Sequence, residues 1–234
     1  AYKKLKEIFR EASISSDIAG ILHWDMSTMM PDNSRNHRAE QLSYLSKLSH
    51  DKVSSNQVRE LIFEAKNEDL NNNDLHNLRE IEREHKLASS IPSDLVQKIS
   101  RTSAKCEGEW QEAKKNSNFN LIKNSLDELI NLTKEEADIL GKEFNLSPYE
   151  ALVNKFEPGS NTKLIANVFD DLQKFLIPLI DTIIEKQKSQ KILPIQNKIN
   201  EIQQKDIAEY IMNIIGFDFK RGRLDKSVHP FCGG

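Results

Sequence analysis

The amino-acid sequence predicts an all-α protein made of long antiparallel helices with short connections between them. Apolar residues recur at steps of three and four along most of the chain, and this spacing places them on one face of a helix. Glycine and proline are scarce, with 8 and 7 residues, and they fall mainly between these stretches. No stretch shows the alternation of apolar and polar residues that is typical of a strand.

The first two helices are predicted from their apolar faces. The face of the first helix consists of Leu5, Ile8, Phe9, Ala12, Ala19, Leu22 and Met26. This helix ends near Pro31, because a residue that precedes proline is pushed out of the α region. The second helix carries a face with the same spacing, formed by Ala39, Leu42, Leu45 and Leu48.

Three more helices follow, each with a recognisable start. Ser54 stands three residues before Gln57, which is the spacing of a capping box, and the helix continues through Val58, Leu61, Ile62 and Ala65. The next helix follows Asn71-Asn72-Asn73 and carries Leu75, Leu78 and Ile81. Pro92 is placed like a first-turn proline for a helix with Leu95, Val96, Ile99, Cys106 and Trp110.

Three more helices are predicted in the second half of the chain, and the first two are long. A helix over 120–144 would be about 37 Å long, which exceeds the usual length in globular proteins. A helix over 162–190 contains Pro178, where a missing amide donor predicts a kink. A last helix over 206–215 ends at Gly216, because glycine is favoured just beyond a helix end.

The helical period stops after Gly216. We therefore predict a helical region over residues 1–216 and a loop segment over residues 217–234. Long segments without regular structure are uncommon in compact domains and are often functional. The chain stops at Gly233-Gly234, and we interpret this ending as a cut.

Composition excludes several classes of protein. The chain has 33 basic and 36 acidic residues, which are interleaved, so it lacks the clustered positive charge of a nucleic-acid-binding protein. No run of eighteen apolar residues occurs, so no membrane span is predicted. The two cysteines form neither a metal motif nor a disulfide framework, which favours a cytoplasmic protein.

Several short motifs occur together in a fixed order. Those near the end of the chain are Gly216-Phe217-Asp218-Phe219, Gly222-Arg223-Leu224-Asp225 and His229-Pro230-Phe231. Those upstream are Leu22-His23-Trp24-Asp25, Arg38-Ala39-Glu40-Gln41-Leu42 and Glu157-Pro158-Gly159. Together they resemble the carboxypeptidase Taq family of metallopeptidases over most of the chain.

The resemblance implies a mostly helical, cleft-containing enzyme that releases C-terminal amino acids from peptides. It also implies a homodimer with zinc or cobalt, held by a His-Glu-x-x-His helix in which the glutamate acts as general base. That motif is absent here, since Glu84-His85 and the pair His76 and His85 lack the spacing. We therefore expect the first half of the enzyme, with no catalytic residue or metal ligand, no bound metal and no activity alone.

Three residues of the last motifs are candidates for substrate binding. His229 would line the cleft and donate a hydrogen bond to the substrate, or it would only fix its loop. Phe231 would line a specificity pocket or pack against its neighbours. Arg223 has the planar fork that suits a substrate carboxylate, but an ion pair with Asp225 that orders the loop is the alternative.

The remaining features have structural interpretations. The stretch 24–30 is rich in methionine and favours core packing over a binding surface, with Asp25 capping or orienting the turn after the first helix. Cys106 is predicted in the core, and Glu135 and Glu136 on a solvated helix face.

A helical interaction module or a pseudo-enzyme remains the alternative function. An exposed apolar patch larger than monomers usually carry would favour the fragment of an enzyme over this alternative.

Overall fold

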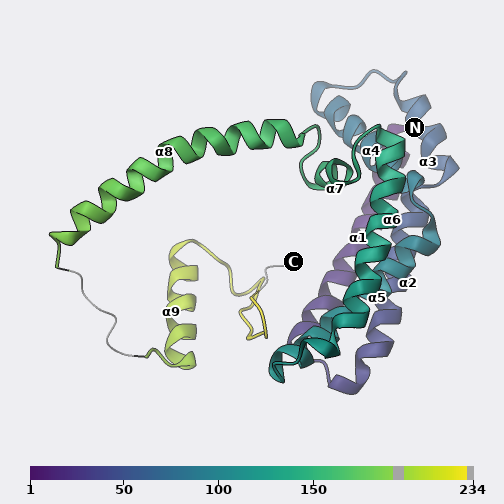
Figure 1. The fold of residues 1–234 in the computed structure, drawn as a ribbon. Helices are drawn as coiled ribbons and strands as arrows, with labels where there is room; N and C mark the ends of the chain where they lie inside the picture. The colour runs from purple at the N-terminus through teal and green to yellow at the C-terminus, as the bar shows by residue number, and fades with distance from the viewer. Residues whose placement is uncertain (192–197, 231–234) are drawn as a thin grey trace. The chain divides into compact units, whose positions relative to one another are not determined.

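A computed structural model describes residues 1–191 and 198–230. Its secondary structure is helical and the described residues contain no strand, which confirms the all-α prediction. Contacts divide the chain into two units (Figure 1). The first comprises Ala1–Gly159 and the segment that begins at Ser227, and the second comprises Ser160–Lys226. The division predicted at Gly216 stays a prediction.

The first unit is a bundle whose long helices run up and down beside one another (Figure 1). Helix α2 is central, since it packs most extensively against α5 and α1. The helices are α1 (Tyr2–Thr28), α2 (Arg35–Val53), α3 (Asn56–Ala65), α4 (Asn72–Ser90), α5 (Ser93–Lys115), α6 (Lys123–Phe144) and α7 (Pro148–Phe156), with 3-10 turns η1 (Asp32–Ser34) and η2 (Phe119–Leu121).

Small side chains bring α2 and α5 close together. Ser43 is 1% exposed, and its hydroxyl donates a hydrogen bond of 3.2 Å to the carbonyl of Gln97. Gly108 of α5 faces Arg35 of α2, and a Cβ atom at Gly108 would meet the Arg35 side chain at 3.0 Å. The Arg35 guanidinium donates to the Gly108 carbonyl and so fastens the start of α2 to α5.

Most residues of the predicted apolar faces lie in or against the core of the first unit, but Leu75 is exposed. One cluster joins α1, α3 and α4 through Tyr2, Leu5, Val58, Leu61, Ile62, Ala65, Leu78 and Ile81. Another joins the start of α5 to α6 and α7 through Ile91, Leu95, Leu140 and Ala151. Cys106 is buried, and Met26 lies in a cluster with residues of α2 and α5, which confirms both as core residues. For Met29, which is 55% exposed, the prediction of core packing is wrong.

Several predicted boundaries move by a few residues. The cap of α3 is Ser55, whose side chain accepts from the amide of Val58, rather than Ser54, because two adjacent serines offer the same cap. Pro92 precedes the first residue of α5. The helix predicted from Asn120 begins at Lys123, after η2, and α7 was not predicted at all.

The prediction that Glu136 is solvated is wrong. Glu136 is buried, and its carboxylate pairs with the ammonium of Lys155 at 2.6 Å, while its neighbour Glu135 is exposed. Lys155 lies on α7, so the ion pair fastens this short helix to α6. A charged residue is buried here because it has a partner.

The second unit contains α8 (Thr162–Lys188) and α9 (Glu201–Ile214). Helix α8 continues through Pro178 and is bowed along its length (Figure 1). Helix α9 begins before the predicted Asp206, because Asn200 and Gln203 form a capping box. Gly216 follows this helix with a φ of +85°, as a glycine beyond a helix end commonly does.

Helix α8 carries apolar residues at helical spacing, but none of its residues is buried. The exposed stripe consists of Leu164, Val168, Phe169, Leu172, Phe175, Leu176, Ile177, Leu179, Ile180, Ile183 and Ile184. An exposed apolar surface of this extent is what the fragment hypothesis predicts. Across the described parts of the chain, no helix combines the length and apolar character that crossing a bilayer requires.

Candidate functional site

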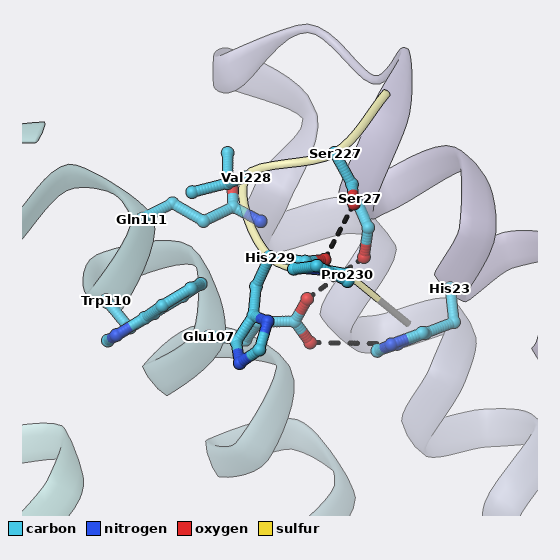
Figure 2. Close-up of a pocket in the computed structure, with 9 residues that line it drawn as sticks. All are labelled: His23, Ser27, Glu107, Trp110, Gln111, Ser227, Val228, His229 and Pro230. Carbon is cyan, nitrogen blue, oxygen red and sulfur yellow. Dashed lines mark hydrogen bonds and ion pairs between the residues drawn. The ribbon is translucent and has the colours of Figure 1, made fainter. Parts of the chain in front are cut away.

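A pocket of about 270 Å³ lies in the first unit and contains the predicted residue His229. Its wall consists of His23, Ser27, Glu107, Trp110, Gln111, Ser227, Val228, His229 and Pro230. Figure 2 shows that these residues come from α1, α5 and the segment after Lys226. The pocket therefore joins three parts of the chain that are distant in sequence.

Helix α1 contributes two residues, which contact Glu107 of α5. His23 and Ser27 are four residues apart, so they lie on the same face of α1. The Ser27 hydroxyl donates to the Glu107 carboxylate at 3.0 Å, and the nearer imidazole nitrogen of His23 lies 3.7 Å from the other carboxylate oxygen (Figure 2). These contacts hold the carboxylate in the pocket with a defined orientation.

Helix α5 contributes a strip of residues that faces the His229 segment. Glu107, Trp110, Gln111 and Lys114 follow the helical repeat, so they share one face. The ring centroids of Trp110 and His229 are 5.9 Å apart at an angle of 42°. The Lys114 ammonium donates to the carbonyl of Val228 at 2.9 Å.

The segment that carries His229 is also fixed from within. The hydroxyl of Ser227 donates to the carbonyl of His229 at 2.6 Å and closes a tight turn. The His229 side chain is exposed and lines the pocket, so it does not lie deep among apolar residues. The imidazole can therefore contact a molecule that enters the pocket.

The upstream motif residues form a hydrogen-bond network between the end of α1 and α2. The Arg38 guanidinium donates to the Leu22 carbonyl at 2.5 Å, to the Asp25 carboxylate at 2.7 Å and to the Gln41 side chain at 2.9 Å. The carbonyl of Asp25 also accepts from the amide of Met30 at 2.8 Å. The backbone of Asp25 thus holds the turn after α1, where a role for this residue was predicted, and its side chain also ties the end of α1 to Arg38 of α2.

Of the other two predicted site residues, the structure describes only Arg223. Arg223 belongs to the second unit and pairs with Asp225 at 2.6 Å, and this hydrogen bond raises the pKa of Arg223 above its ordinary value. The ion pair that was the alternative for Arg223 is therefore present. Phe231 lies outside the described residues.

Sequence reasoning missed most of the pocket wall. Trp110 was taken as a core residue, and it does pack against the cluster of Cys106, Ala113 and Ile122, but its ring also faces His229. Glu107 and Lys114 drew no prediction. Their helical spacing with Trp110 was a signal that they share a face, but it could not show that the His229 segment covers that face.

The donor set of the pocket does not fit a metal ion. Among residues 1–191 and 198–230, no three histidine, cysteine, aspartate or glutamate side chains gather as a metal site would require. His23, Glu107 and His229 all line the pocket, but their donor atoms are not gathered closely enough to hold one ion. The residues of the pocket can contact and orient a molecule, and no metal-dependent step is assigned to them.

Relatives with known names match almost the whole chain. Carboxypeptidase 1 of Bacillus subtilis is 29% identical over 232 residues, and the match covers 98% of this chain and 46% of the relative. Thermostable carboxypeptidase 1 of Pyrococcus furiosus is 29% identical over an alignment of 242 positions, and the match covers 97% of this chain and 48% of the relative. The chain spans about half the length of the curated relatives it matches.

Solved structures also match almost the whole of this chain and about half of their own length. The crystal structure of BsuCP superposes with a TM-score of 0.87 at 28% identity, covering 98% of this chain and 46% of that chain. Metallocarboxypeptidase 1 of Trypanosoma cruzi gives a TM-score of 0.78 at 30% identity, covering 99% of this chain and 47% of that chain. A sequence model of the family described as carboxypeptidase Taq (M32) metallopeptidase matches residues 4–234. Because this match spans nearly the whole sequence, the chain belongs to the carboxypeptidase Taq (M32) metallopeptidase family.

Proposed function

We propose that the full-length gene product is a metal-dependent carboxypeptidase that releases C-terminal amino acids from peptides, and that this chain forms one wall of its substrate cleft. The observation that carries the proposal is the place of His229. In a chain of this family, an exposed imidazole is held over a pocket by contacts from α5. Such a fixed ring can donate a hydrogen bond to a peptide carbonyl and to the negative charge that develops on it.

Zinc or cobalt is the proposed metal. Bound to the enzyme, it would polarise the scissile carbonyl and activate water. The ligands and the general base are proposed to lie outside these 234 residues, so the chain alone is proposed to be inactive and to bind no metal. Phe231 and Arg223 are proposed to contribute to substrate binding, although the ion pair with Asp225 supports a structural role for Arg223. A cytoplasmic homodimer is proposed for the complete enzyme.

The apolar stripe of α8 supports the proposal that this chain is part of a larger protein. A helix of 27 residues with no buried residue gains little from tertiary packing, which is the main source of helix stability in proteins. The part of the family fold that these 234 residues do not cover would supply the missing contacts. A helical interaction module would also need a partner for this stripe, but the family match favours the peptidase.

The test uses the full-length gene product and N-blocked dipeptides with either a free or an amidated C-terminus. We expect release of the last amino acid only from substrates with a free carboxylate. A chelator should abolish this activity, and Zn²⁺ or Co²⁺ should restore it. Equal cleavage of the amidated substrates, or activity that resists chelation, would sink the proposal.

The contribution of His229 is measured in the same assay. We expect His229→Ala to lower kcat/KM by roughly a hundredfold, the scale on which loss of one donor to a developing oxyanion acts. His37→Ala is the matched control, because His37 lies on α2 outside the pocket. A His229 variant as active as the control would show that this ring does not act on the substrate.

A further inference from the structure

The segment Ser227–Pro230 contacts α5 through two side chains to which the proposed function assigns no contact with the substrate. Lys114 donates from its ammonium to the Val228 carbonyl at 2.9 Å. Trp110 places its ring 5.9 Å from the ring of His229. Lys114 holds the backbone next to His229, and Trp110 contacts the His229 side chain. Together the two residues restrict the position of the backbone and of the imidazole.

The two fastening residues also act on each other. The Lys114 ammonium lies 5.2 Å from the centroid of the Trp110 ring, within the range of a cation–π interaction. Trp110 and Lys114 are four residues apart on α5, so they are neighbours on its surface. The Trp110 ring is thus contacted by an ammonium from its own helix and by the imidazole from the distant segment.

Helix α5 is a rigid support for these contacts. It has buried residues along its length, and α2 packs extensively against it. The Trp110 ring itself packs against the cluster of Cys106, Ala113 and Ile122. A residue held by such a helix can set the position of a segment that has few other contacts.

We propose that Trp110 and Lys114 are positioning residues that hold the imidazole of His229 in the pocket. Neither residue needs to touch the reacting atoms. The consequence for catalysis rests on the proposed function, whereas the consequence for the conformation of His229 does not. Without the contacts from Trp110 and Lys114, the imidazole of His229 should move away from the position in which it contacts the substrate. Small displacements of this kind lower reaction rates strongly.

Lys114 gives the cleaner test, because it is exposed and its replacement leaves the core intact. Lys114→Met removes the ammonium and keeps most of the side chain, while Lys114→Arg keeps a donor for the Val228 carbonyl. Lys98→Met is the matched control, since Lys98 is an exposed lysine of α5 that pairs with Asp94 and does not contact the His229 segment.

Two measurements are made on the full-length gene product. The first is ¹⁹F NMR of protein labelled with 5-fluorotryptophan, in which the Trp110 signal is assigned by its loss in Trp110→Phe. We expect Lys114→Met to move this signal towards its position in His229→Gln, and Lys114→Arg and Lys98→Met to leave it in place. The second is peptide hydrolysis, where we expect Lys114→Met to lower kcat/KM roughly tenfold and Lys114→Arg to recover it to within about twofold.

Each outcome decides the proposal. An unchanged ¹⁹F signal in Lys114→Met would overturn it, and so would a moved signal with unchanged kinetics in an active enzyme. Failure of Lys114→Arg to recover either measurement would also count against it. If the gene product has no peptidase activity, the proposed function fails, and the ¹⁹F measurement alone decides whether Trp110 and Lys114 hold His229.

Discussion

Helices α5 and α8 have the same kind of sequence and different surroundings. Both are long, with 23 and 27 residues, and both carry apolar residues at helical spacing. Buried residues occur along α5 from Leu95 to Ala113, whereas α8 has none. Apolar spacing therefore predicts that a helix forms and which of its faces is apolar. It does not predict whether another part of the 234-residue chain covers that face.

The largest expected effect is the loss of stability when a buried leucine of α5 is truncated, compared with the same substitution in α8. Leu95 of α5 is 2% exposed and Leu172 of α8 is 45% exposed. We expect Leu95→Ala to lower the free energy of unfolding of the 234-residue chain by about 2–5 kcal/mol, because it leaves a cavity in the core. Leu172→Ala, the matched control, should change it by less than about 0.5 kcal/mol. Urea unfolding followed by circular dichroism measures both.

The same pair sharpens the comparison in the full-length gene product. If another part of the protein covers α8 there, the cost of Leu172→Ala should rise towards that of Leu95→Ala. If Leu172→Ala lowers the free energy of unfolding equally little in both proteins, α8 remains uncovered in the full-length gene product. This result would weaken the proposal that another part of the protein packs against α8.

A smaller effect is expected from the ion pair between α6 and α7. Lys155→Met leaves the buried Glu136 carboxylate without its partner, so we expect a loss of about 1–3 kcal/mol in the free energy of unfolding. In α8 the ion pair of Lys174 and Asp171 is exposed on both sides, and Lys174→Met should cost about 0–1 kcal/mol. Urea unfolding measures both variants.

The Lys155 prediction has an internal control. Glu136→Gln in the Lys155→Met background removes the buried charge, so it should recover part of the loss. A Lys155 variant as stable as the Lys174 variant would show that Glu136 is solvated after all, as the sequence alone suggested.

The sequence predicts what depends on near neighbours in the chain. The apolar faces of α1 and α3 are correct because residues three and four apart share a face in every helix. The burial of Glu136 could not be predicted, because its partner Lys155 lies on another helix. The adjacent serines at 54 and 55 offered the same cap, and only the backbone geometry distinguishes them.

The same limit applies to the pocket. His229 was found through its motif, and the Arg38 network joins residues that the upstream motifs contain. Lys114 and Val228 are 114 positions apart, so no local pattern could join them. The spacing of Trp110 fits the apolar face of α5, and its ring does pack against the core there. The structure adds a contact with the His229 ring that this spacing could not predict.

The smallest expected effect is the pH dependence of the first unit, where two carboxyls fasten α2 to its neighbours. The hydrogen bond from Lys52 of α2 lowers the pKa of Glu11 of α1 below its ordinary value of 4.5. Partial burial raises the pKa of Asp51, but hydrogen bonds from Lys47 and Ser93 and the nearby His50 imidazole outweigh this, and the pKa lies below its ordinary value of 3.8.

The sign of the effect follows from these shifts. A carboxyl whose pKa is lower in the folded state binds protons more weakly there, so its stabilisation is present above the ordinary pKa and is lost as the pH falls through the folded value. We therefore expect Asp51→Asn to lower the melting temperature slightly at pH 7, and this difference from the wild type should shrink below about pH 3.8. Thermal unfolding from pH 7 to pH 3 measures it, with Asp171→Asn of α8 as the exposed control. A difference that grows as the pH falls would reverse the assigned direction and remove Asp51 from the contacts that stabilise the first unit.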